Sequence, residues 1–195
     1  MEALTFSTDI ARKTISGRGV LLDWAAWASS QQIDFDPFSR PPREIPLSEL
    51  LAVAAAQNTT FHTGDILIIR TGWLAAFARL DQEQKAQLPR RATRSSIGVE
   101  ASTEVMKWHW DNAFAAVASD TVAYEAWPSP RRNEFGLSLH EIFLAGWGCP
   151  IGESFDLEKL ALKCQELHRW TFFFCSTPLY VAGGVASPPG AVAIL

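Results

Sequence analysis

Four consecutive apolar residues in the first half of the chain constrain the fold most. The run Ile66–Ile69 reads Ile-Leu-Ile-Ile and follows a Gly-Asp pair that is typical of a turn. A strand with one face in water alternates apolar and polar side chains, and this run does not. It therefore predicts a strand buried on both faces, as in α/β proteins whose sheets are covered on both sides. We expect an α/β fold.

Other segments predict a mixture of strands and helices, with no internal repeat. Short apolar runs predict further strands at residues 19–22, 114–118, 172–174 and 191–195. Helix formers or helical spacing predict helices at 47–57, 74–88, 100–110, 139–147 and 157–167. Asp156 is the expected N-cap of the last helix, residues 29–46 a long loop, and Gly183-Gly184 a turn. Because the chain ends in an apolar run, we expect its last residues to pair with the sheet.

The composition predicts one domain and excludes some partners. The chain has 195 residues, and 48% of them are hydrophobic. We therefore expect residues 1–195 to form a single domain with its own core. The net charge of -4 disfavours nucleic acid, and Arg90, Arg91 and Arg94 form only a local basic cluster. The beginning lacks a basic segment followed by an apolar one, and no run approaches the ~20 apolar residues of a membrane span. We therefore expect a cytoplasmic protein that binds neither nucleic acid nor membrane.

One ordered arrangement of potentially reactive side chains lies at residues 139–153. His140 opens an apolar segment that predicts two helical turns, ended by Gly148 and Pro150, and Glu153 follows a tight turn. A helix that folds back through the Gly-Pro turn would bring both side chains to one wall of a pocket. An imidazole and a carboxylate held together suit a divalent metal ion or an acid–base pair. The alternative is a surface His140 and a solvated Glu153 near the next helix start.

Two further candidates end predicted strands. Arg70 emerges from the buried strand and needs either an anionic partner or an exit to water. Asp120 follows the strand at 114–118, where α/β folds commonly place functional groups, but an aspartate there can equally cap the next turn. For both residues these alternatives stay open.

Five blocks of the sequence occur in an order that characterises one protein family. They are GRGVLLD (17–23), GDILIIRTGW (64–73), FAAVASDT (114–121), LHEIFLAGWGCPIGESFDLEKLA (139–161) and STPLYVAGGVASPPGAVAIL (176–195). Together they resemble the cyclase family, which includes the bacterial-type kynurenine formamidases and many fungal homologues. The fungal branch, with its IGE-x-FDLE and GG-x-ASPP blocks, is the best fit. The resemblance covers nearly the whole chain from about Gly17.

The resemblance implies a swivelling β/β/α fold, usually dimeric, with a zinc or manganese site. In that family the metal activates water for amide hydrolysis, or for related ring-closing and ring-opening chemistry on a small molecule. A histidine before the last helix and a glutamate just after it belong to the metal centre, and these fall on His140 and Glu153. The candidate substrate contacts are Arg70 for an acidic group, Trp73 and Trp127 for an aromatic one, and Asp120.

The sequence departs from the family in its earlier metal motif. Family members carry H-x-G-T-H-x-D, or a T-Q-W-D variant in fungal members, and neither form occurs here. The four histidines, His62, His109, His140 and His168, show no metal-ligand spacing. We therefore expect an N-terminally shortened domain, the C-terminal two-thirds of the family fold, with an incomplete metal site.

Three hypotheses follow. In the first, the protein is a metal-dependent hydrolase of arylformamidase type, and Asp23, Asp120, His109 or a second subunit supplies the missing ligands. In the second, it is a metal-free isomerase, cyclase or dehydratase of secondary metabolism, in which His140 and Glu153 are base and acid. In the third, it is a non-catalytic paralogue that binds a ligand, or pairs as a homodimer or as a heteromer with a longer family member. Eight tryptophans, if exposed, would favour this partner role.

Overall fold

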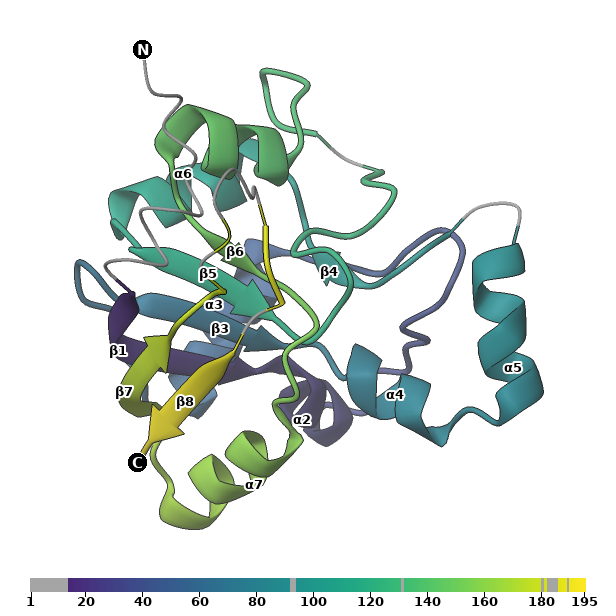
Figure 1. Cartoon of the computed structure of the whole chain (residues 1–195), viewed down its shortest axis with the longest axis horizontal. Coiled ribbons are helices and arrows are strands. Elements are labelled where there is room, and N and C mark those ends of the chain that lie inside the picture. Colours follow the sequence, from purple (N-terminus) through teal and green to yellow (C-terminus); the bar gives the residue numbers. More distant parts are fainter. Residues whose placement is uncertain (1–13, 92–93, 131, 180, 182–185, 189) are drawn as a thin grey trace.

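A six-stranded sheet forms the centre of the protein (Figure 1). The computed structural model describes residues 14–91, 94–130, 132–179, 181, 186–188 and 190–195. Within them the sheet has the order β6-β5-β3-β1-β7-β8, and β2 pairs separately with β4. The strands are β1 (Ile15–Asp23), β2 (Glu44–Ile45), β3 (Ile66–Arg70), β4 (Gly98–Val99), β5 (Ala116–Ser119), β6 (Ile151–Gly152), β7 (Thr171–Ser176) and β8 (Ala191–Ile194). The helices are α2 (Trp24–Ser30), α3 (Leu47–Ala56), α4 (Trp73–Arg79), α5 (Gln82–Gln87), the 3₁₀ turn η1 (Leu88–Arg90), α6 (Thr103–Asp111), the π-helix η2 (Glu141–Trp147) and α7 (Glu158–Leu167).

The inner strands are parallel and buried on both faces. β1 pairs in parallel with β3, β3 with β5 and β5 with β6, whereas β7 and β8 join antiparallel at the other edge. Residues Ile66–Ile69 are at most 1% exposed, which confirms the predicted doubly buried strand. The expected α/β fold is therefore present.

Each face of the sheet packs against its own apolar layer. On one face, side chains of β1, β3 and β5 pack with α3, α6 and η2 through Leu50, Val53, Val105, Met106 and Phe143. On the other face, the alternate side chains of the same strands pack with α7 through Leu157, Ala161 and Cys164. Full burial of such a side chain contributes roughly 1.5–3 kcal/mol, so these two layers hold the sheet between them. None of the helices in the described part of the chain has the length and apolar character that a membrane crossing needs.

The structure corrects several predicted boundaries, and it divides the helix expected at 74–88 into α4, α5 and η1. The last helix begins at Glu158 rather than directly after Asp156, because the Asp156 carboxylate accepts the Glu158 N–H two residues on and so closes a local turn. β5 begins at Ala116, because Phe114 leaves the strand register and packs edge-on against Phe61 and Trp108. The expected Gly183-Gly184 turn lies outside the described residues.

The last residues pair with the sheet, as expected from their apolar composition. β8 forms an antiparallel ladder with β7 in which Ile194 lies opposite Phe173 and Val192 opposite Cys175. These side chains are not covered, since Phe173, Val192 and Ile194 are each more than half exposed. The backbone of the terminal strand is thus ordered by pairing rather than by burial of its side chains.

A glycine in β4 fixes the path of the residues that follow β5. The Val99 N–H donates to Tyr124 O (3.0 Å), and the Ala126 N–H donates to Val99 O (2.9 Å). A Cβ atom at Gly98 would lie 2.3 Å from the carbonyl carbon of Glu125, which is closer than such atoms approach. Only glycine at position 98 therefore lets residues 121 to 127 lie against β4. We call these residues the 121–127 segment.

Gly98→Ala should destabilise the protein, because the added methyl group must push the backbone of Glu125 away. Overpacking of this kind costs about 1–3 kcal/mol, and chemical denaturation would measure the loss. Gly17→Ala in β1 is the matched control, because its Cβ would find its nearest neighbour at an ordinary 3.6 Å. Equal stability of the two variants would contradict this account of β4.

Candidate functional site

His140 lies between two carboxylates. Its Nδ1 is 2.6 Å from Glu125 Oε2, and its Nε2 is 2.9 Å from Glu153 Oε1. The His140 backbone N–H also donates to Glu125 Oε1, at 3.2 Å. The ring is therefore fixed at both nitrogens, and Glu125 holds both the side chain and the main chain of His140.

Three separate elements bring these side chains together. His140 immediately precedes η2, whose start is capped where the Ser138 backbone N–H and hydroxyl donate to Glu141. Glu153 follows β6, and the next residue, Ser154, donates its N–H to Thr121 O (2.9 Å). Glu125 belongs to the 121–127 segment that lies against β4. The expected back-folding of residues 139–153 is therefore present, although the helix is a π-helix.

The electrostatic environment favours a protonated imidazole. The hydrogen bonds to Glu125 and then to Glu153 raise the pKa of His140 to about 10, against the opposing effect of burial. Glu125 is fully buried, whereas about a third of the Glu153 side chain is exposed. At neutral pH both ring nitrogens thus donate to carboxylates, one sealed inside the protein and one open to a cavity.

A small apolar cavity begins at His140 and Glu153. Its volume is about 270 Å³, and it lies on the face of the sheet that α7 also covers. Apart from His140, Glu153, Gly152, Ser176 and Ser187, the lining is apolar: Ile15, Ile66, Ala116, Val117, Ala118, Leu144, Pro150, Ile151, Phe155, Phe174, Pro178 and Ala186. The ionic groups therefore stand at one end of a largely apolar space, which we call the His140 cavity.

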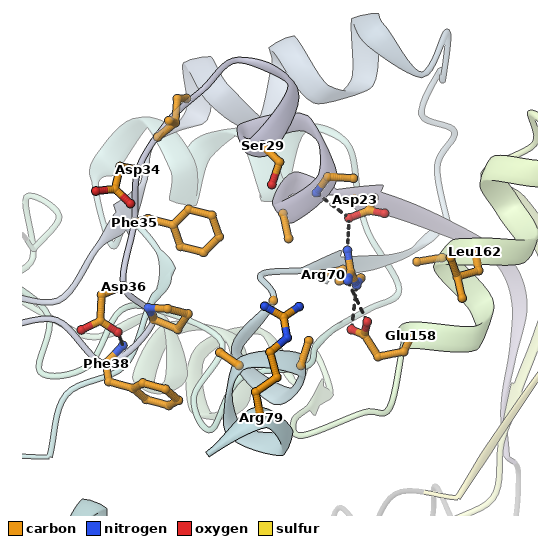
Figure 2. A pocket seen from close by; sticks show the side chains of 18 of the residues that line it. Asp23, Ser29, Asp34, Phe35, Asp36, Phe38, Arg70, Arg79, Glu158 and Leu162 are labelled. Atoms are coloured by element: carbon orange, nitrogen blue, oxygen red, sulfur yellow. Dashed lines mark hydrogen bonds and ion pairs between the residues drawn. The ribbon is translucent and has the colours of Figure 1, made fainter. Parts of the chain in front are cut away.

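Arg70 lies elsewhere, in a wider cavity of about 760 Å³ (Figure 2). Its Nε and Nη2 donate to the two oxygens of Glu158, both at 2.8 Å, and its Nη1 donates to Asp23 Oδ1 at 2.7 Å. These ion pairs hold the guanidinium in its charged form. The anionic partner that the sequence required is thus provided by the protein itself.

Asp120 binds the two residues between β3 and α4. Its carboxylate accepts the backbone N–H groups of Thr71 (2.6 Å) and Gly72 (2.9 Å) and the Thr71 hydroxyl (2.8 Å). Complete burial raises the pKa of Asp120, and these hydrogen bonds oppose that rise. The side chain ties the end of β5 to the end of β3.

Trp73 and Trp127 line a third cavity of about 630 Å³. We call it the tryptophan cavity; its other polar lining residues include Lys85, Arg91, Arg94 and Ser96. Neither tryptophan lines the His140 cavity. Of the residues singled out in the sequence, the structure therefore brings His140 and Glu153 together, and it places Arg70, Asp120 and the two tryptophans apart from them.

The residues named as further metal ligands do not converge on His140 and Glu153. Asp23 is bound by Arg70, and Asp120 accepts the N–H groups of Thr71 and Gly72. His109 is buried in the core, with Nδ1 2.7 Å from Val105 O and Nε2 2.8 Å from the Tyr124 hydroxyl, and burial lowers its pKa to about 4. In the described part of the chain, no group of three or more His, Cys, Asp or Glu side chains is arranged to hold a metal ion.

Sequence inspection missed Glu125, the buried partner of His140. The available signal was its position within Tyr124-Glu125-Ala126-Trp127, where a carboxylate is flanked by apolar and aromatic residues. A carboxylate in such surroundings needs a donor or a cation. The sequence gives no means of identifying that donor, because His140 is fifteen residues away.

Comparison with known proteins identifies similar folds. The family model described as "Putative cyclase" matches residues 3–126. A protein whose crystal structure is described as that of a novel cyclase shares 29% sequence identity with this chain. The two structures superpose with a TM-score of 0.75, and the match covers 92% of this chain and 54% of that one. An isatin hydrolase bound to the product analogue thioisatinate is 16% identical, with a TM-score of 0.62 and 95% and 62% coverage. Isatin hydrolase A from Ralstonia solanacearum is 17% identical, with a TM-score of 0.65 and 96% and 63% coverage.

The chain therefore spans less than two thirds of the length of these solved structures. The likeness to the isatin hydrolases, at this identity, shows a shared fold alone. No curated protein matches the chain.

The ring of His140 should titrate near pH 10 rather than near its ordinary pKa of 6.5. Glu125→Gln removes the charged hydrogen bond that contributes most to this rise. The variant should therefore lower the pKa of His140 by at least one unit, roughly the value of one such bond. NMR of the imidazole nitrogens against pH would measure both values. A wild-type ring that loses its proton near pH 6.5 would contradict the arrangement.

The same contacts make stability depend on pH. The folded-state pKa of His140 lies above its unfolded value, so the contacts stabilise the protein fully below about pH 6.5, and this contribution is lost as the pH rises through about 10. The stability difference between wild type and His140→Gln should therefore be larger near neutral pH than above pH 10. Denaturant titrations of both proteins across this pH range would measure the difference in their free energies of unfolding. A difference that stayed constant with pH would show that the ring is uncharged throughout and would contradict the prediction.

Proposed function

The chain belongs to the cyclase family, and on this premise we propose that it catalyses acid–base chemistry on a small apolar carbonyl compound. The reaction class is hydrolysis of an amide or lactone, or the related cyclisation or dehydration. The observation that carries the proposal is the His140–Glu153 pair, joined at 2.9 Å and open to an apolar cavity. The presence of isatin hydrolases among the similar folds supports a hydrolytic member of this class.

The two side chains suit complementary roles. Glu153, the partly exposed carboxylate, accepts the proton of a water molecule as its oxygen bonds to the substrate carbonyl carbon. The His140 imidazolium supplies its Nε2 proton, which in the ligand-free protein is hydrogen-bonded to Glu153. That proton passes to the leaving nitrogen or oxygen as the bond to the carbonyl carbon breaks. Each side chain thereby exchanges one proton, and the charges balance.

Glu125 acts as a positioning residue in this proposal. It is fully buried and cannot reach a substrate in the His140 cavity, but it fixes the Nδ1 side of the ring. A buried carboxylate also stabilises the positive charge of the imidazolium. His140 is therefore held with Nε2 toward Glu153 and the cavity.

The cavity favours a compact ring as substrate. Its volume of about 270 Å³ is at the lower end for small-molecule sites. Phe155 and Phe174 stand edge to face with ring centroids 6.3 Å apart, and both line the space. An aromatic ring with one carbonyl group near His140 meets both the apolar walls and the ionic end.

The residues described here do not complete a zinc or manganese site. A catalytic zinc generally needs three protein ligands, and His140 and Glu153 supply two. Both nitrogens of His140 are also engaged by carboxylates. A metal-assisted reaction would therefore need ligands beyond this pair, for example from a second subunit.

A second candidate function is pairing with another chain, as a homodimer or with a longer family member. The observation that favours it is the uncovered apolar edge of the sheet, where Phe173, Val192 and Ile194 are 51%, 58% and 59% exposed. Size-exclusion chromatography with light scattering tests it. A monomer that stays monomeric when mixed with a full-length relative would exclude this function.

Formanilide, an aryl formamide, is a suitable test substrate because it offers one ring and one amide. If the proposal is right, Glu153→Gln should lower kcat/KM by about 10²–10⁴-fold, the usual contribution of a general base. Glu134→Gln makes the same charge change at an exposed position of the 125–153 stretch and should leave the rate unchanged. Activity should also survive a chelator.

Two outcomes would contradict the proposal. Wild-type turnover that Glu153→Gln leaves unaffected would remove Glu153 from the chemistry. Turnover that a chelator abolishes and added Zn²⁺ or Mn²⁺ restores would assign water activation to a metal instead.

A further inference from the structure

The tryptophan cavity is separate from the His140 cavity. α4 and α5, which project away from the sheet (Figure 1), border it on one side, and the 121–127 segment borders it on the other. The 121–127 segment lines the tryptophan cavity and, through Glu125, holds His140 at the other cavity. Glu125 contacts His140, whereas Val122, Ala123 and Trp127 line the tryptophan cavity.

The charged lining of the tryptophan cavity is entirely positive. Lys85, Arg91 and Arg94 line it, and no aspartate or glutamate does so among the described residues. This is unusual in a chain with a net charge of -4. Arg91 is held in place, since its Nη1 donates to Phe38 O (3.1 Å). Three cations without a carboxylate favour an anionic ligand.

The walls between these cations are aromatic. Trp73 stacks on Phe77 with a centroid distance of 5.2 Å and an angle of 9°, and it meets Phe38 edge to face at 5.5 Å. Trp127 leaves 48% of its surface exposed. Large exposed aromatic surface beside cations suits a planar apolar body that carries the negative charge.

Two buried polar atoms of lining residues have no partner. Trp73 Nε1 and Ser96 Oγ are inaccessible to solvent and make no hydrogen bond within the part of the chain that the structure describes. Ser96 as a whole is only 1% exposed. Buried donors without acceptors are rare in native proteins because each costs free energy. Each atom would gain an acceptor from a ligand only if the side chains that cover it moved when the ligand bound.

We propose that the tryptophan cavity is a binding site for a small aromatic carboxylate, distinct from the His140 site. The aromatic body packs against Trp73 and Trp127, and the carboxylate accepts hydrogen bonds from Arg94. A neutral aromatic compound would leave the positive charge of the lining without a counter-charge. An inorganic anion would leave the aromatic walls exposed.

1-Naphthoate is a suitable probe, with binding measured by isothermal titration calorimetry at low ionic strength. Arg94→Gln removes one charged hydrogen bond from an exposed position and should raise Kd about tenfold. Trp127→Ala should raise it about fivefold through the lost ring contact. Arg79→Gln makes the same charge change in the Arg70 cavity and should leave Kd unchanged. Methyl 1-naphthoate, which lacks the charge, should bind at least tenfold more weakly.

His140→Gln should bind the probe as the wild type does, so failure of the acid–base proposal would not affect this result.

The proposal would be overturned if Arg94→Gln and Trp127→Ala both bound 1-naphthoate with the wild-type Kd. It would also be overturned if the methyl ester bound as tightly as the acid. Absence of saturable binding to the wild-type protein would overturn it as well.

Discussion

The requirement that most of this structure depends on is burial of β1, β3 and β5 on both faces. Because these strands have no solvated side, helices must cover the sheet above and below, and polar groups can appear only where the strands end. Arg70, at the end of β3, pairs with Asp23 at the adjacent end of β1 and with Glu158 of α7. Asp120, at the next strand end, is satisfied by the backbone that begins α4. The charges at this edge of the sheet therefore support the fold.

Because the charges at the strand ends support the fold, the residues that position the candidate reactive group come from the segment after β5. The 121–127 segment lies against β4, where glycine at position 98 permits close approach, and alternate residues of the segment serve different surroundings. Glu125 enters the interior and fixes His140, whereas Trp127 stays half exposed at a cationic cavity. A single short segment thus positions the histidine of one cavity and lines a second cavity of different chemistry. One is apolar with an ionic end, and the other is aromatic with an entirely positive charged lining.

The substrate contacts inferred from the family do not gather around His140. Arg70 was a reasonable candidate for an acidic group because a cation at the end of a buried strand needs an anion, but the protein supplies two carboxylates of its own. Trp73 and Trp127 do lie together, as walls of one cavity. The cations that line this cavity are Lys85, Arg91 and Arg94, and Arg70 is not among them. Local sequence indicates that a charge needs a partner. It does not indicate whether that partner is a ligand or a distant part of the chain.

The sequence by itself determined the elements: the non-alternating run at Ile66–Ile69 required a doubly buried strand, and the apolar end required pairing with the sheet. It also indicated that the helix after His140 ends at Gly148 and Pro150, but it left open whether residues 139–153 fold back and bring His140 and Glu153 together. Only the tertiary structure decided that Glu125, from outside that stretch, holds His140, and that the expected additional ligands point elsewhere. The physical reason is range. Helix and strand preferences arise between neighbours in the chain, whereas pairing of buried charges depends on how distant segments cross.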